Sequence, residues 1–135
     1  MNKIKVGFQY LDTEYELGPT DSDKQSFMIG ANWKIAGPHS VQAGYTEADD
    51  TGGSNTTVTI GGGNGVIMPN APGTSTGGKF YSVSYQYSFS KRTSARFGYA
   101  VVDNDSHANY SLGGLRNQSL GQKQEALVMF LQHNF

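Results

Sequence analysis

The chain has 135 residues, of which 36% are hydrophobic and 16% charged, so it has the length of one small domain. Its formal net charge of −1 gives no basis for nucleic-acid binding or for an acidic tail. Because the sequence contains no cysteine, disulfides, thiolate metal sites and cysteine nucleophiles are excluded.

The N-terminal stretch MNKIKV begins like the charged start of a secretory signal. Gln9, Asp12 and Glu14 then interrupt the apolar core that such a signal needs, so we expect no signal peptide. The sequence also has no run of 18 apolar residues, which argues against a transmembrane helix.

Apolar and polar residues alternate with a period of two in six stretches, which is the pattern of β-strands with one apolar face. In the clearest stretch, Tyr81, Val83, Tyr85 and Tyr87 alternate with small polar residues. Most stretches have about the 9–11 residues that a tilted strand needs to cross a bilayer. We place the strands near residues 3–13, 25–36, 40–48, 79–90, 94–103 and 124–135.

The residue types on the two faces of these strands distinguish between two possible β architectures. A soluble sandwich meets water with many Lys and Glu, whereas the polar faces here carry mostly Ser, Gly, Gln, Asn and Thr. Such residues suit the wall of a water-filled lumen. The apolar faces carry aromatic residues near the strand ends, like the girdles of a membrane barrel: Tyr10, Trp33, Tyr45, Tyr81, Tyr87, Phe89 and Phe135. The pattern therefore favours an all-β, antiparallel transmembrane β-barrel over the alternative, a soluble β-sandwich binding module.

Long and short connections alternate along the chain. Residues 14–24, 49–78 and 104–123 are long connections, and outer-membrane barrels place long loops outside and short turns in the periplasm. We therefore assign a periplasmic turn to four residues: Ser90, Lys91, Arg92 and Thr93. Within residues 49–78, the stretches NTTVTI and GVIM predict a short external hairpin, with a fold toward the lumen as the alternative.

The segment YSFSKRTSARFGYAVVDNDS resembles a strand–turn–strand segment of the Gram-negative general porins of the betaproteobacterial type. The ending LQHNF is similar to the terminus of that family, from which it departs at Gln132 and Asn134. The resemblance implies a sixteen-stranded barrel in outer-membrane lipid, generally a homotrimer, that passes small hydrophilic solutes with some anion preference. Six strands then correspond to the C-terminal part of such a porin.

Basic residues lie on the predicted lumen face, and acidic residues are absent from the middle of that face. We take Lys3, Lys5, Lys34 and Arg96 as pore-lining, because a basic lumen attracts anions. In the alternative interpretation, the three lysines sit near strand ends and only mark the water boundary.

The last strand places apolar residues at alternate positions before a final Phe. Leu127, Met129, Leu131, His133 and Phe135 resemble the signal that the barrel-assembly machinery reads in outer-membrane proteins. The same spacing also fits a lipid-facing last strand, and both interpretations can hold together.

Six strands do not close a barrel by themselves. Open edges in lipid leave unpaired backbone groups that cost several kcal/mol each, so we expect a fragment of a longer porin or an assembly of several chains. The competing functional class is an outer-membrane or surface β-domain that acts as an adhesin or interaction protein through its long loops. No motif in the sequence indicates catalysis, a cofactor or a metal site, so we expect a non-enzymatic protein without cofactors.

Overall fold

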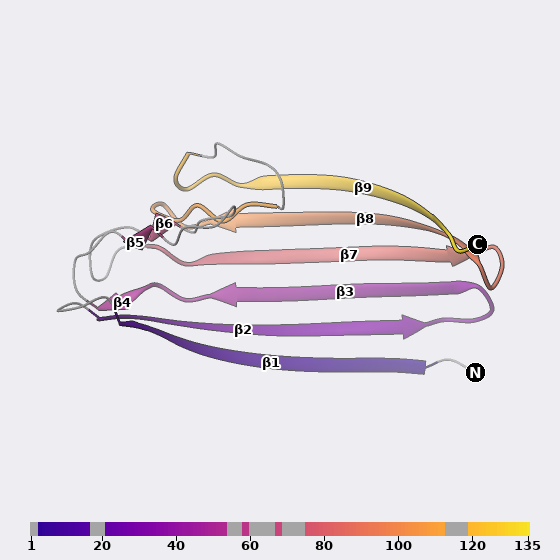
Figure 1. The fold of residues 1–135 in the computed structure, drawn as a ribbon, viewed down its shortest axis with the longest axis horizontal. Helices are drawn as coiled ribbons and strands as arrows, with labels where there is room; N and C mark the ends of the chain where they lie inside the picture. The colour runs from indigo at the N-terminus through magenta and orange to yellow at the C-terminus, as the bar shows by residue number, and fades with distance from the viewer. Residues whose placement is uncertain (1–2, 17–20, 54–57, 60–66, 69–74, 113–118) are drawn as a thin grey trace.

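Six long antiparallel strands form one open sheet in the computed structural model (Figure 1). The structure describes residues 3–16, 21–53, 58–59, 67–68, 75–112 and 119–135. The order across the sheet follows the chain: β1 (Lys3–Glu16), β2 (Asp21–Lys34), β3 (His39–Ala48), β7 (Gly78–Ser88), β8 (Thr93–Asn104) and β9 (Gln124–His133). This arrangement confirms the predicted all-β antiparallel fold.

Three short strands belong to the long connection between β3 and β7. β4 (Gly52–Gly53) pairs with β2, whereas β5 (Val58–Thr59) and β6 (Ile67–Met68) pair with each other. The antiparallel pair of β5 and β6 is the hairpin that NTTVTI and GVIM predict. The residues between its two strands lie outside the described ranges.

β1 and β2 extend further toward each other along the chain than the alternation predicts. β1 continues to Glu16 and β2 begins at Asp21, so most of the loop expected at residues 14–24 is paired strand. Near Thr13 and Lys24 both faces of the pair are polar, and hydrophobic alternation therefore gives no signal there. Backbone pairing alone continues the ladder beyond the apolar band. β9, by contrast, ends at His133, two residues before the predicted end.

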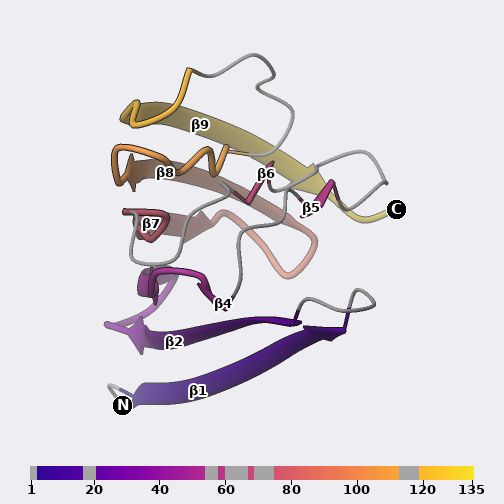
Figure 2. The ribbon, with the colours of Figure 1, turned by 90° about the vertical axis from the view of Figure 1, so that its left-hand side faces the viewer.

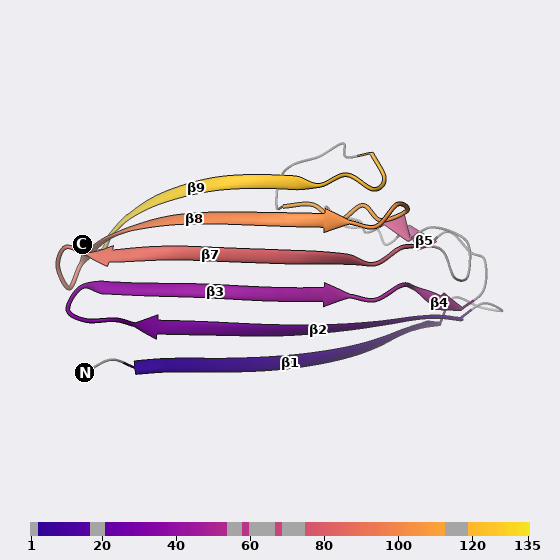
Figure 3. The same cartoon turned by 180° about the vertical axis from the view of Figure 1, so that it is seen from behind.

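Short turns and long connections lie at opposite ends of the sheet (Figures 1 and 3). Between β2 and β3, Gly37 has a φ of 54°, which favours glycine, and the His39 backbone N–H donates to the Ala36 carbonyl over 3.2 Å. Between β7 and β8, Ser90 Oγ accepts hydrogen bonds from the backbone N–H groups of Arg92 and Thr93, each at 3.1 Å. We refer below to the opposite end, with its long connections, as the loop end.

The apolar face of the sheet has no second layer among the described residues. Its large side chains are exposed, with Phe8 at 69% and Leu127 at 84%. The buried apolar residues are few and small: Ala95, Val101, Val102 and Ala108. A sandwich would cover this face with a second sheet, so the sandwich alternative is wrong for the part of the chain that is described.

β1 and β9 are the two edges of the sheet and do not meet (Figure 2). Within the described ranges, the chain contains no helix that is long and apolar enough to span a bilayer.

Candidate functional site

The strand register brings the polar residues of all six long strands together in lateral rows. One row near the short turns runs through β1, β2, β3, β7, β8 and β9 as Lys3, Lys34, Ser40, Gln86, Arg96 and Phe130. The next row toward the loop end contains Lys5, Asn32, Gln42, Ser84, Gly98 and Val128. All four predicted pore-lining residues therefore share one face and two adjacent rows.

Positive charge is the common property of the ionisable groups on this polar face. Among the side chains that the structure describes on the six long strands, those charged on the polar face are Lys3, Lys5, Lys24, Lys34 and Arg96. The acidic ones point to the apolar side, at the loop end: Asp12, Glu14, Asp23, Glu47, Asp103 and Glu125. Of the described side chains on these strands, the acidic ones thus lie off the polar face, whereas the basic Lys79 lies with them on the apolar side.

Small side chains occupy the middle of the polar face. Gly7, Gly30, Gly44, Ser82, Ala100 and Ala126 follow one another across the six strands. Because these residues extend little from the backbone, they leave space above the sheet at mid-height.

Arg96 lies between two open hollows on the polar face. Its Nη2 donates a hydrogen bond of 2.7 Å to Oε1 of Gln86 on the neighbouring strand. One hollow, of about 450 Å³, lies toward Gln42 and Ser84, and the other, of about 520 Å³, lies toward Ser94 and Gln132. The side chain of Phe130 lines both hollows as well.

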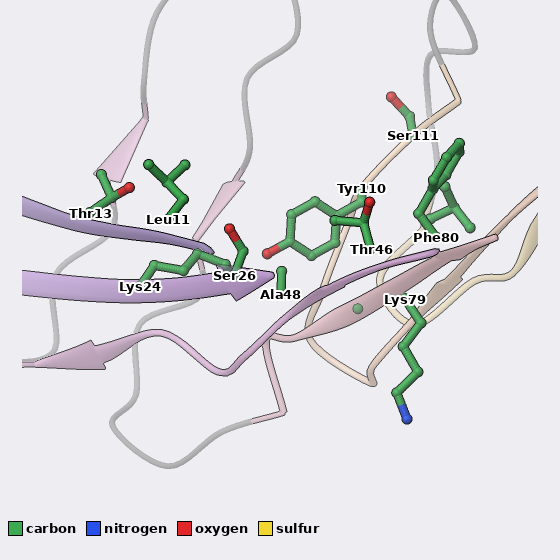
Figure 4. Close-up of a pocket in the computed structure, with 12 residues that line it drawn as sticks. Leu11, Thr13, Lys24, Ser26, Thr46, Ala48, Lys79, Phe80, Tyr110 and Ser111 are labelled. Atoms are coloured by element: carbon green, nitrogen blue, oxygen red, sulfur yellow. The ribbon is translucent and has the colours of Figure 1, made fainter. Parts of the chain in front are cut away.

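A third hollow, of about 350 Å³, lies at the loop end of this face (Figure 4). Leu11, Phe80 and Tyr110 give it an apolar lining, and Lys24 enters it from β2. Lys79, which comes from the same region, points away from the hollow and pairs with Glu47 over 3.6 Å.

Lys24 joins β2 to two separate loop segments, a role that sequence reasoning missed. Its Nζ donates to Thr51 Oγ1 over 3.3 Å and to the Thr76 carbonyl over 3.4 Å, and it lies 4.9 Å from the centre of the Tyr110 ring. Since Thr76 and Lys24 are 52 residues apart in the sequence, no local pattern signals this contact.

Burial lowers the pKa of Lys24, which lies beyond the aromatic residues that bound the apolar band. Desolvation disfavours the charged ammonium, whereas the carboxylates of Asp50, Asp49 and Asp105 oppose the shift in that order. The acidic neighbours also offset much of the positive charge of Lys24, so this lysine offers less attraction to an anion than the other basic residues of the face.

The loop segments around Lys24 are held by two polar side chains, of which Asp50 is exposed and Asn104 is buried. Asp50 Oδ1 accepts hydrogen bonds from the backbone N–H groups of Thr76 and Gly77, at 2.7 and 2.9 Å. Asn104 receives the Tyr110 N–H at 2.7 Å and donates to the carbonyls of Tyr110 and Gln122, at 2.9 and 2.7 Å. We call these contacts of Asp50 and Asn104, together with those of Lys24, the loop clamp.

Aromatic side chains form two belts on the apolar face. Toward the loop end, Tyr45 contacts both Phe27 and Tyr81, with ring centres 5.7 and 5.1 Å apart. At the end with the short turns, Tyr87 and Phe89 have ring centres 4.9 Å apart. Two belts around an apolar band match the interfacial girdles of a membrane barrel.

The residues of the predicted assembly signal lie on the same apolar side. Leu127, Met129 and Leu131 are 84%, 73% and 75% exposed, and His133 and Phe135 continue the line with ring centres 4.7 Å apart. Recognition by the assembly machinery stays a prediction, while the exposure fits contact with lipid.

Comparison with known proteins identifies one family. Residues 1–107 match the model of the Gram-negative porin family, whereas no curated protein and no solved structure matches the chain. The match is to the family in general, so the betaproteobacterial type stays a prediction. The polar face, the aromatic belts and this match agree, and the chain belongs to the Gram-negative porins, the channel proteins of the outer membrane.

Proposed function

We propose that the chain forms part of the wall of an anion-preferring channel for small hydrophilic solutes. The observation that carries this proposal is that every charged side chain described on the polar face of the six long strands is basic. Fixed positive charges beside a water-filled path lower the energy of anions and raise that of cations.

Lys3, Lys5, Lys34 and Arg96 are the residues to which we assign the preference. Lys3 and Lys34 are direct partners in the register of β1 and β2, and like charges in such positions repel each other. An anion between the two ammonium groups offsets that repulsion. Arg96 extends the same row three strands further.

Additional strands must complete the barrel in this proposal. Each of the edge strands β1 and β9 has a neighbour on one side only. Unpaired backbone groups cost several kcal/mol each in hydrocarbon, so an open sheet is not a stable state in lipid. We propose that this sheet is the C-terminal portion of a longer porin; several copies of the chain closing one barrel is the competing arrangement. A homotrimer and the barrel-assembly machinery are the partners that the family resemblance implies.

The reversal potential in a KCl gradient across a planar bilayer tests the preference. We expect Lys34→Glu and Arg96→Glu each to lower the anion-to-cation permeability ratio, roughly fivefold, because each replaces a positive by a negative charge beside the ion path. Lys91→Glu is the matched control, since it makes the same charge change on an exposed turn away from the lumen face.

Equal shifts for all three variants would contradict a role for the lumen charges. Counting the chains in each conducting particle by native mass spectrometry tests the closure separately. If the 135-residue chain alone gives reproducible channels with several copies in each particle, the barrel is closed by several copies of this chain. The proposal of a longer porin would then be wrong.

A further inference from the structure

We propose that Arg96 and Phe130 form a subsite in the lumen that binds small anions carrying a planar apolar ring, with aromatic carboxylates as the ligand class. This inference rests on the proposed anion-preferring channel and adds a preference for the shape and polarity of the anion.

Phe130 departs from the pattern of the face on which it lies. The polar face consists mainly of small or polar residues, yet Phe130 is 62% exposed on it. A large ring left in water gains nothing for the sheet, and an aromatic residue exposed in a polar lumen is a local inconsistency of the kind found at functional sites. Phe80, on the same face, is by contrast half-buried at the loop end.

Arg96 lies directly opposite Phe130 in the register of β8 and β9. The hydrogen bond to Gln86 Oε1 uses one of the five guanidinium N–H groups and fixes the direction of the side chain. Among the described residues, the ion pairs join Lys79 to Glu47 and Lys123 to Glu125, so no carboxylate neutralises Arg96. The guanidinium therefore keeps donors for a carboxylate that arrives from the lumen.

The two side chains are shared by both hollows of this region. The hollows measure about 450 and 520 Å³, which is enough for a single-ring molecule with its hydration. A carboxylate on Arg96 places an attached ring beside Phe130, where offset or edge-to-face contact is favourable. Neutral hydrogen-bonding groups complete the lining, from Gln42, Ser84, Ser94 and Gln132.

Block of the ionic current by benzoate tests the subsite in the closed barrel, reconstituted in a planar bilayer. Acetate supplies the charge without the ring, and benzyl alcohol supplies the ring without the charge. We expect benzoate to block at lower concentration than either of them. Phe130→Leu is expected to weaken the block by roughly two- to tenfold, the range of one aromatic contact. Arg96→Gln is expected to weaken it by about tenfold or more, because a hydrogen bond to a charged group is lost.

Matched variants separate the subsite from general effects on the channel. Phe80→Leu removes an aromatic ring that β7 places on the same polar face, and Lys34→Gln removes a positive charge of the same lateral row as Arg96. Both are expected to leave the benzoate-to-acetate ratio of blocking concentrations unchanged. The reversal potential in KCl alone is expected to stay the same in Phe130→Leu.

Three results would overturn the subsite. Benzoate could block no better than acetate, or Phe80→Leu could weaken the block as much as Phe130→Leu does. In the third, Phe130→Leu leaves both the open-channel conductance and the block unaltered, which means that another segment of the barrel covers the ring. The KCl reversal potential reports the general anion preference independently, so failure of the subsite and failure of the proposed function are distinguishable.

Discussion

The wall of the sheet, by which we mean the part between the two aromatic belts, differs from the loop end in the kind of side chain that it buries. Between the two aromatic belts, large apolar side chains such as Val6 and Leu127 are 67% and 84% exposed. At the loop end, several of the most buried residues are polar, with Thr76 at 2% and Asn104 and Gln124 each at 7%. The wall therefore exposes large apolar side chains, whereas the loop end buries polar ones.

This difference shows which environment each region uses. The wall satisfies its backbone by strand pairing and leaves its apolar side chains for lipid, which supplies the apolar surroundings. The loop end lies beyond the aromatic belt and has to order long connections in water. It does so with hydrogen bonds between buried polar groups, each of which has a partner in the described residues.

The largest expected effect comes from placing a charge on the lipid side of the wall. Val83 lies on the apolar face in the row between the two belts, beside Ala43 and Tyr99. We expect Val83→Arg to lower the free energy of unfolding in lipid vesicles by about 2–4 kcal/mol, because arginine near the bilayer midplane is costly. Urea-induced unfolding of the reconstituted barrel measures this change.

Ser84→Arg is the control, since it places the same side chain one residue further along β7, on the water-facing side. We expect a change of less than about 1 kcal/mol for Ser84→Arg. A loss of stability as large as that of Val83→Arg would show that the two faces are assigned the wrong way round.

The wall could be predicted from the sequence to a greater extent than the loop end. A period of two fixes which residues share a face, and this was sufficient to place Arg96 on the polar face of the sheet and Tyr87 on the apolar face. The same parity places Phe130 on the polar face, yet the prediction for this strand considered only the apolar residues of the opposite face. Departures from a pattern carry functional information that the pattern itself hides.

The loop clamp could not be predicted for a physical reason. Asp50 reaches Thr76 across 26 residues, and Lys24 reaches Thr76 across 52, so each contact depends on the register of the strands between them. Propensity and periodicity describe neighbours along the chain and contain no information about such distances. The extended pairing of β1 and β2 brings Lys24 to the clamp, and this extension also lacked a sequence signal.

An intermediate effect is expected from breaking the loop clamp at Asn104. Asn104→Ala removes three hydrogen bonds, two of which are to the part-buried backbone of Tyr110. We expect the protection of the Tyr110 and Leu112 amides against hydrogen exchange to fall by about 2–3 kcal/mol, because three hydrogen bonds of about 1 kcal/mol each are lost from the loop clamp. The amides in the centre of β7 should keep their protection, because the wall is paired independently of the loops.

Asn109→Ala serves as the control for Asn104→Ala, since its side chain makes no hydrogen bond within the described residues. Equal loss of protection in β7 and in the loop would mean that the two regions unfold as one unit. The contrast between wall and loop end would then describe burial only and not separate stabilities.

The smallest expected effect concerns the charge on Lys24. Because burial lowers the pKa of Lys24 below 10.5, the folded loop end binds this proton less tightly than the unfolded chain. The contribution of Lys24 to stability therefore rises with pH between its lowered pKa and 10.5. Cleavage of the loops by subtilisin, normalised to an unfolded substrate, is expected to slow slightly across that window, and Lys24→Met is expected to remove this dependence.

Lys123 provides a control of opposite sign. Its hydrogen bond to Glu125 raises the pKa of Lys123 above 10.5, so its contribution is present at lower pH and is lost as the pH rises through the raised value. Lys123→Met should therefore leave the rise below pH 10.5 in place. If the rise survives in Lys24→Met, the buried ammonium is not the group that couples pH to the stability of the loop end.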